Sequence, residues 1–242
     1  MSTIYTAEQF KKGYPDGFEN HFWTMTRNCI LLREIVRHGL NHERILEIGC
    51  GRGGTVKFLR DNSIECFGVE LGTCSVINGA KKFIRIGTDV MDLDIRERDS
   101  YTVLMLLDVI EHISEPIEFL RELLSKFSNL KSLVITVPAG QKIWSNYDTF
   151  WGHYRRYEHI TIRETIQNIG MAEVYLSYFF HSLYTAAILQ LRIRKHRELE
   201  AISPEGYKKI LHKLIFYFFL LEYQIAPRFM RGTSILSISK RQ

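Results

Sequence analysis

Apolar residues along this chain alternate between short continuous runs and stretches with helical spacing. The runs predict strands at 44–49, 66–70, 83–90, 102–107, 132–137, 173–180 and 234–240. Apolar residues three or four positions apart predict helices at 19–36, 53–61, 73–82, 116–127 and 160–170. The segment 102–107 is almost entirely apolar, which is typical of a central strand that is buried on both faces.

This alternation of strands and helices predicts a single α/β domain over 1–242, built on a doubly wound, Rossmann-like sheet. A helical insertion at 181–231 precedes the last strand. It contains the apolar run 214–221, which is far shorter than the ~20 residues that cross a bilayer. Three interpretations of the insertion stay open. It forms a lid over an acceptor pocket, it contacts a membrane peripherally through 206–228, or it forms a dimer contact.

Glycines interrupt the first strand abruptly. Gly49, Gly51, Gly53 and Gly54 follow the apolar positions of 44–49, and a helical pattern begins directly afterwards. Glycine tolerates a positive φ and a close ligand, and a helix N-terminus offers free N–H groups. The turn is therefore predicted to cradle a nucleotide.

The spacing of these glycines fits two cofactor classes. Gly49, Gly51 and Gly54 match G-x-G-x-x-G, the dinucleotide pattern. Gly49, Gly51 and Gly53 also match G-x-G-x-G, with Glu47 two positions upstream. Glu70 lies about 20 residues further on, where both classes place a carboxylate that accepts hydrogen bonds from ribose hydroxyls.

Composition narrows the class of protein. The chain has 242 residues, of which 45% are apolar and 24% charged, as in soluble globular proteins. Residues 1–18 contain no apolar leader, so a cytoplasmic location is expected. The four cysteines lack zinc-site spacing, and no metal is expected.

Charge is uneven along the chain, whose net charge is +5. Residues 181–242 contain 11 Lys and Arg against 4 Asp and Glu, a balance of 11 − 4 = +7. A basic C-terminal quarter suits a phosphate-bearing substrate, an anionic membrane or nucleic acid, and a solvated face is an equally good account.

Several motifs together resemble the class I S-adenosylmethionine-dependent methyltransferases, in particular the group related to ubiquinone-biosynthesis O-methyltransferases. The resemblance covers about 19–180 and the terminal strand. Its motifs are His21-Phe22-Trp23 with Arg27, the acidic glycine turn, the D-V-x-E-H string at 108–112 and the loop 144–157.

The resemblance implies a fold and a cofactor. The strand order would be 3-2-1-4-5-7-6 with the last strand antiparallel, and a helix within 1–40 would help to cover S-adenosylmethionine. Arg27 would hold the methionine carboxylate, and Asp89 would contact the adenine amino group. The residues expected at the cofactor are Arg27, Glu47, Gly49, Cys50, Gly51, Gly53, Glu70, Leu71, Asp89, Val90, Asp108 and Val109.

The resemblance also suggests the acceptor, a small-molecule or carbohydrate-like compound methylated at a hydroxyl by in-line transfer. His153 is the first candidate for a general base because its natural pKa lies near neutrality, and His112 is the second. The residues expected at the acceptor are Asp148, Arg155, Arg156 and Tyr157. Arg155 and Arg156 would clamp a phosphate or carboxylate of the acceptor, and a salt bridge to Asp148 is the alternative that stays open. The chain lacks the D/N-P-P-Y/F string of amino-methyltransferases, which disfavours nucleic acid. A monomer and a homodimer both stay open.

Two alternative functions share parts of this pattern. An NAD(P)-dependent oxidoreductase would use the glycine turn and Glu70, but it leaves Asp89, the 108–112 string and the loop around His153 unexplained. A non-catalytic S-adenosylmethionine-binding protein would keep the fold and the cofactor site. A binding assay separates the first alternative from methyl transfer, and a turnover assay separates the second.

Overall fold

Seven strands form one sheet at the centre of the molecule. The structure is a computed structural model that describes residues 9, 12–13, 15–193, 197–199 and 202–241, so much of the expected N-terminal cover segment before residue 15 lies outside it. The sheet has the order β3-β2-β1-β4-β5-β7-β6, and β7 is antiparallel to both of its neighbours. The predicted α/β fold and strand order are therefore confirmed. The strands are β1 (Ile45–Ile48), β2 (Cys66–Glu70), β3 (Ile84–Ile86), β4 (Val103–Leu107), β5 (Ser132–Pro138), β6 (Met171–Phe179) and β7 (Ser234–Arg241).

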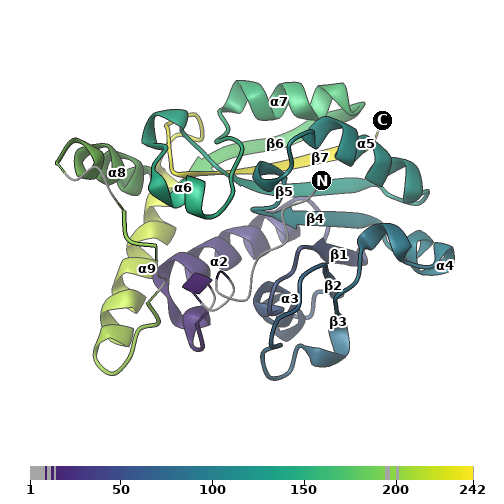
Figure 1. Cartoon of the computed structure of the whole chain (residues 1–242), viewed down its shortest axis with the longest axis horizontal. Helices are drawn as coiled ribbons and strands as arrows, with labels where there is room; N and C mark the ends of the chain where they lie inside the picture. The colour runs from purple at the N-terminus through teal and green to yellow at the C-terminus, as the bar shows by residue number, and fades with distance from the viewer. Residues whose placement is uncertain (1–8, 10–11, 14, 194–196, 200–201, 242) are drawn as a thin grey trace.

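Helices cover both faces of this sheet (Figure 1). One face packs against α5 and α7, and the other packs against α2 and α3, with α9 against α2. The α-helices are α2 (Phe22–Arg37), α3 (Gly54–Asp61), α4 (Ile95–Asp99), α5 (Pro116–Lys126), α6 (Asn146–Phe150), α7 (His159–Asn168), α8 (His181–Ile193) and α9 (Lys208–Ile225). Short 3-10 turns are η1 (Phe18–Asn20), η2 (Lys81–Phe83), η3 (Val90–Asp92), η4 (Ile110–His112) and η5 (Gln141–Ile143).

The central strand β4 shows why the sequence reads as a continuous apolar run. All five of its residues are buried. Leu104 and Leu106 belong to the core beneath α5 and α7, whereas Val103 and Met105 belong to the core beneath α2 and α3. Because successive side chains point to opposite faces, a strand covered on both faces needs apolar residues at every position.

The helix predicted at 73–82 is wrong. Residues 73–80 are irregular, and only the 3-10 turn η2 follows at Lys81–Phe83. The segment is tied to the glycine turn instead, because Arg52 donates from Nε to the Ser75 carbonyl (3.0 Å) and Ile77 N–H donates to the Arg52 carbonyl (3.1 Å). Gly79, with φ of 86°, adds a left-handed residue that an α-helix does not accommodate. The adjacent β3 is also shorter than the predicted 83–90.

The insertion between β6 and β7 contains α8 and α9. Phe219 of α9 is buried and stacks 5.6 Å from Phe22 of α2, measured between ring centroids. Glu222 of α9 accepts hydrogen bonds from the backbone N–H groups of His181 (2.9 Å) and Ser182 (2.8 Å), which begin α8. Among the described residues, no helix has the length and apolar character needed to cross a membrane.

Candidate functional site

A large cavity opens at the carboxyl ends of β1 and β4. It has a volume of about 1050 Å³, and its walls come from α2, the glycine turn, the segment after β4, the loop around α6 and the insertion. Parallel sheets bind ligands at this kind of edge, where neighbouring strands send their connections to opposite faces. The predicted site residues that line the cavity are Arg27, Glu47, Gly49, Cys50, Asp108, His112, His153 and Arg156.

The glycine turn needs its glycines for two physical reasons. Gly49, Gly51 and Gly53 have φ of 73°, 52° and 82°, a region that other residues rarely adopt. A Cβ at Gly49 would lie 2.9 Å from Cγ2 of Val109, and one at Gly53 would lie 2.8 Å from Cδ1 of Ile84. The turn therefore brings bare backbone to the edge of the sheet, with α3 starting directly behind it.

Glu70 lies at the end of β2 beside this turn. Its carboxylate accepts hydrogen bonds from the N–H of Gly51 (2.9 Å) and of Gly72 (2.7 Å). Asp89 follows β3 and caps η3 by accepting from Met91 N–H (2.9 Å). Backbone N–H groups thus fix both carboxylates, which follow β2 and β3 as the sequence predicts. Neither carboxylate belongs to the lining of the large cavity. Other predicted cofactor residues outside that lining are Gly51, Gly53, Leu71, Val90 and Val109.

Three ionisable side chains, Arg27, Glu47 and Asp108, gather on one side of the cavity near the glycine turn. Arg27 donates from Nη1 to Oδ2 of Asp108 (2.9 Å) and from Nη2 to Oγ1 of Thr55 (3.0 Å), while its guanidinium lies 4.8 Å from the ring centroid of Trp23. Burial raises the pKa of Glu47 to about 8. Arg27 opposes this shift, and the neighbouring Glu70 and Asp108 carboxylates add to it. Within the part of the chain that the structure describes, Oε2 of Glu47 has no hydrogen-bond partner. This wall of the cavity suits a cationic ligand.

Asp148 organises the opposite side of the cavity. Its Oδ1 accepts from Nδ1 of His153 (2.8 Å) and from Nε of Arg156 (2.7 Å), and its Oδ2 accepts from Ser145 N–H (2.9 Å). Burial alone would raise the pKa of Asp148, but the hydrogen bonds from His153 and Arg156 outweigh it, so the pKa lies below its usual value. The carboxylate therefore stays ionised and fixes the His153 ring.

The residues predicted to bind the acceptor fall into two sets. Arg156 lines the cavity, but its guanidinium is committed to Asp148 and to the Ala139 carbonyl (3.0 Å). Arg155 donates to the Ser114 carbonyl, and Tyr157 is buried in the core. Neither Arg155 nor Tyr157 lines the cavity. The paired arginines thus face different directions.

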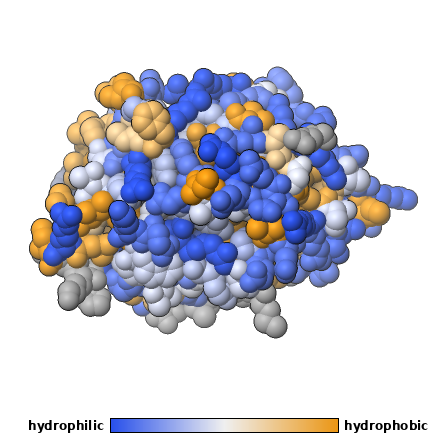
Figure 2. Space-filling view, turned by 90° about the horizontal axis from the view of Figure 1, so that it is seen from above, coloured by the Kyte–Doolittle hydropathy of each residue, from blue (hydrophilic) through white to orange (hydrophobic). Residues whose placement is uncertain are grey.

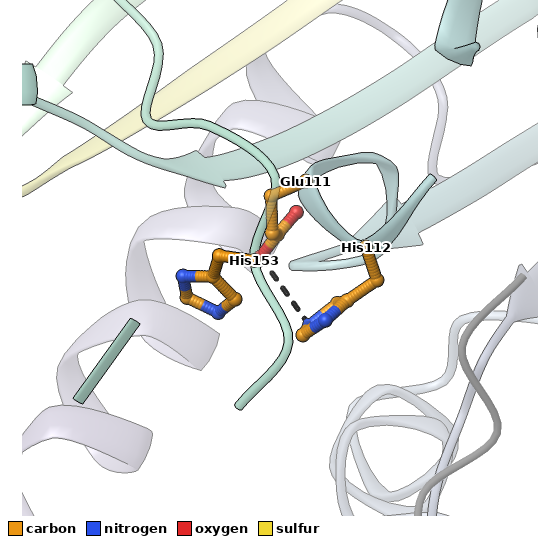
Figure 3. A group of neighbouring side chains, drawn as sticks. All are labelled: Glu111, His112 and His153. Atoms are coloured by element: carbon orange, nitrogen blue, oxygen red, sulfur yellow. Dashed lines mark ion pairs between the residues drawn. The ribbon is translucent and has the colours of Figure 1, made fainter. Parts of the chain in front are cut away.

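One cluster in the cavity could hold a metal ion, although the sequence analysis expected none. Ligand atoms of Glu111, His112 and His153 all lie within 4.8 Å of one another. Figure 3 shows the three side chains converging, two from η4 and one from the loop after α6. Glu111 is fully buried, and neither of its carboxylate oxygens has a hydrogen-bond partner among the described residues. Burial, with a contribution from His153, lowers the pKa of His112 to about 3 and keeps its imidazole neutral.

Sequence reasoning assigned no role to two residues that the fold brings into the cavity. Glu111 lies inside the 108–112 string, so its motif was visible, but its proximity to His153 was not. Arg197 belongs to the insertion and lines the cavity. Its backbone N–H donates to Oδ1 of Asn146 (2.8 Å), and its carbonyl accepts from Nδ2 of the same side chain (3.0 Å). This pairing joins the insertion to the loop that carries Asp148.

Comparison with known proteins adds a family and a fold. The family model described as a methyltransferase domain matches residues 23–170. No curated protein matches the chain significantly. A phosphoethanolamine N-methyltransferase 2 from Haemonchus contortus, solved with phosphomonomethylethanolamine and S-adenosylhomocysteine, is similar at 15% identity and a TM-score of 0.59, covering 98% of this chain and 61% of that one.

Two other solved structures are similar at lower scores. Magnesium protoporphyrin IX methyltransferase from Synechocystis, with bound S-adenosylhomocysteine, has 13% identity and a TM-score of 0.52, covering 90% of this chain and 83% of that one. The [4+2]-cyclase SpnF has 15% identity and a TM-score of 0.50, and the match covers 88% of this chain and 80% of that one. Identities this low establish a shared fold and leave the reaction to the residues of the site.

Proposed function

Because the chain belongs to the class I S-adenosylmethionine-dependent methyltransferases, whose domain model matches residues 23–170, we propose that it transfers a methyl group to a hydroxyl of a small-molecule or carbohydrate-like acceptor. The observation that carries this proposal is the single cavity of about 1050 Å³ that joins the glycine turn to the Asp148–His153 pair. We assign the wall with the glycine turn to the cofactor and call it the cofactor wall, and we assign the wall with His153 to the acceptor and call it the acceptor wall. Membership of the ubiquinone-biosynthesis group stays a prediction.

The cofactor wall fits S-adenosylmethionine in shape and charge. Gly49 lines the cavity without a side chain, and Oε2 of Glu47, which has no hydrogen-bond partner among the described residues, suits an ammonium or sulfonium group. We assign the methionine end to the wall formed by Glu47, Asp108 and Arg27. We assign Glu70, beside the turn, to the ribose hydroxyls and Asp89 to adenine, as the resemblance to the family implies.

On the acceptor wall, His153 is the candidate base. S-adenosylmethionine supplies an electrophilic methyl group on a sulfonium whose sulfur is a good leaving group, so the protein mainly aligns the acceptor and removes its proton. Because Nδ1 of His153 donates to Asp148, its Nε2 carries a lone pair that can accept the hydroxyl proton. Asp148 then stabilises the resulting imidazolium, as a buried carboxylate does in hydrolytic triads.

A divalent cation on Glu111, His112 and His153 is a second way to activate the hydroxyl. It is favoured by the buried Glu111 carboxylate, which the base mechanism leaves without a role and without a hydrogen-bond partner. Two neutral imidazoles and a carboxylate suit transition metals or zinc, and a bound cation lowers the pKa of an oxygen ligand. In this version Glu111, His112 and His153 would hold the cation, which would lower the pKa of the acceptor hydroxyl, and solvent would take its proton.

The acceptor class is proposed as a small molecule. The similar structures include enzymes whose names state phosphoethanolamine and a porphyrin as substrates, both of them small molecules. One protein with the same fold is named a [4+2]-cyclase and not a methyltransferase, so a turnover measurement is required to establish methyl transfer.

Calorimetry with S-adenosylhomocysteine and with NADH tests the cofactor, and release of S-adenosylhomocysteine with a panel of hydroxylated small molecules tests the reaction. We expect binding of the first ligand, no heat with NADH, and acceptor-dependent release. Heat with NADH alone would contradict the proposal.

Assays with chelator and with added Mg²⁺, Mn²⁺ or Zn²⁺ distinguish the two mechanisms. A general base needs no metal, so chelator should leave turnover unchanged. A metal on the Glu111 cluster predicts that chelator abolishes turnover and that one of the cations restores it.

A further inference from the structure

Helix α9 presents a long apolar stripe to solvent. Six of its residues, which recur at three- and four-residue steps and are 53–73% exposed, are Ile210, Leu214, Tyr217, Phe218, Leu221 and Ile225. Side chains at this spacing lie on one face of a helix. These six residues are called the α9 stripe. Monomeric soluble proteins rarely expose contiguous apolar surface of this extent without a partner for it.

The opposite face of α9 is firmly attached to the rest of the protein. Phe219 is 5% exposed and packs between Phe22 of α2 and Phe180, with ring centroids 5.6 Å and 5.1 Å away. Tyr223 shares a hydrogen bond with Tyr175 of β6, with 2.6 Å between their hydroxyl oxygens. The helix therefore cannot rotate to bury the stripe without breaking this packing.

Positive charge accompanies the stripe. Lys209 and Lys213, four residues apart, are exposed along one edge of it, and Lys208 lies at the start of the helix. Within 207–231 there are five Lys and Arg and one acid, a balance of 5 − 1 = +4. That acid, Glu222, is bound to the N-terminal backbone of α8 and is 9% exposed. No carboxylate on the exposed surface of α9 offsets its lysines.

From this combination we infer that the α9 stripe binds the surface of an anionic lipid bilayer, with α9 lying in the plane of the interface. An apolar face with aromatic residues and flanking lysines is the pattern of interfacial helices. Anionic headgroups attract such lysines, whereas no described helix could span the bilayer. Figure 2 shows hydrophilic and hydrophobic residues interleaved at the end of the molecule where α8 and α9 lie in Figure 1.

A second copy of the chain fits this surface less well. Two copies packed stripe to stripe would leave Lys209 and Lys213 of each helix without an opposite charge on α9, because α9 offers no exposed carboxylate to pair with them. Anionic headgroups supply that opposite charge along the whole edge of the stripe. The inference does not depend on methyl transfer, because it uses no residue of the cavity.

Sedimentation of the full chain with vesicles tests this inference. Vesicles of phosphatidylcholine alone are compared with vesicles that contain 30 mol% phosphatidylserine, at about 50 mM and about 500 mM salt. We expect binding to the anionic vesicles that weakens at high salt and is weak or absent with the neutral ones. An L214E/F218E variant should bind at least about 30-fold more weakly, and K209Q/K213Q should lose about 30-fold, since each lysine near an anionic surface is worth a factor of about five.

The matched control is I95E/I160E, which places the same charges at two apolar residues that are 61% and 58% exposed on other helices. It should bind anionic vesicles like the unmodified chain, and all variants should keep the same circular dichroism spectrum. The inference fails if the unmodified chain does not sediment with anionic vesicles at low salt, or if the control loses as much binding as L214E/F218E. It also fails if the unmodified chain is a dimer that L214E/F218E converts to monomer.

Discussion

The two walls of the cavity are built in different ways. The centre of the cofactor wall is local, because the glycine turn, Glu47 and Arg52 lie within a few residues of one another, whereas Arg27 and Asp108 join it from other segments. The acceptor wall is assembled from distant segments, since Glu111 and His153 are 42 positions apart (153 − 111) and Arg197 comes from the insertion. The local wall presents mainly backbone of the glycine turn, whose conformation the sequence pattern predicts. In the assembled wall, the chemistry depends on individual side chains that come from distant segments.

The largest expected effect is the loss of turnover when His153 is replaced, which tests whether the acceptor wall acts independently of the cofactor wall. His153→Ala should lower turnover by about 10²–10⁴-fold, because it removes the proton acceptor or a metal ligand, and leave cofactor affinity nearly unchanged. Steady-state kinetics and calorimetry with S-adenosylhomocysteine measure the two quantities on the same sample.

The control for His153 is His42→Ala, since His42 is exposed and lies outside the cavity lining. It should change neither quantity. Equal loss of cofactor affinity and turnover in His153→Ala would show that the two walls are not independent.

The second prediction addresses the cofactor wall. Glu70→Ala should weaken S-adenosylhomocysteine binding by about 1.5–3 kcal/mol, roughly 10–150-fold in Kd, the scale of hydrogen bonds to a charged group. Its effect on turnover at saturating cofactor should be small. Glu118→Ala, an exposed acid on α5, is the matched control. Unaltered Kd in Glu70→Ala would remove Glu70 from the cofactor site.

The third and smallest expected effect is a pH dependence of cofactor affinity. Burial raises the pKa of Glu47 to about 8, so below that pH the free protein carries this side chain mostly protonated. A cationic ligand stabilises the ionised form, so binding releases a proton. Affinity for S-adenosylmethionine should therefore rise with pH, by up to about tenfold per unit between pH 6 and 8.

Calorimetry in buffers of different ionisation enthalpy measures that proton release directly. Glu47→Gln should bind more weakly at pH 8 and show a flatter pH profile, while His153→Ala should keep the profile of the unmodified chain. A slope that survives in Glu47→Gln would assign the pH dependence to another group.

The sequence by itself determined the fold and the glycine turn at the end of β1. A strand such as β4 is recognisable because every position is buried and therefore apolar. Gly49 is recognisable because its positive φ is a conformation that other residues rarely adopt. Both constraints act over a few neighbouring residues, so they are legible in the order of amino acids. The failed helix at 73–82 marks the limit of such reasoning, because backbone and side-chain hydrogen bonds to Arg52 replace the local helical pattern there.

Only the tertiary structure decided how the acceptor wall is arranged and which face of α9 is exposed. Neither follows from spacing, because each depends on contacts between segments far apart in the chain. Asp148 binds both His153 and Arg156, so for Arg156 the structure shows the salt bridge that the sequence left open as an alternative, while Arg155 donates to the Ser114 carbonyl. On α9, Phe219 is buried because it packs against α2, whereas the adjacent Phe218 is 53% exposed. Adjacent phenylalanines are equivalent to a sequence pattern, and it is the neighbouring helix that makes them different.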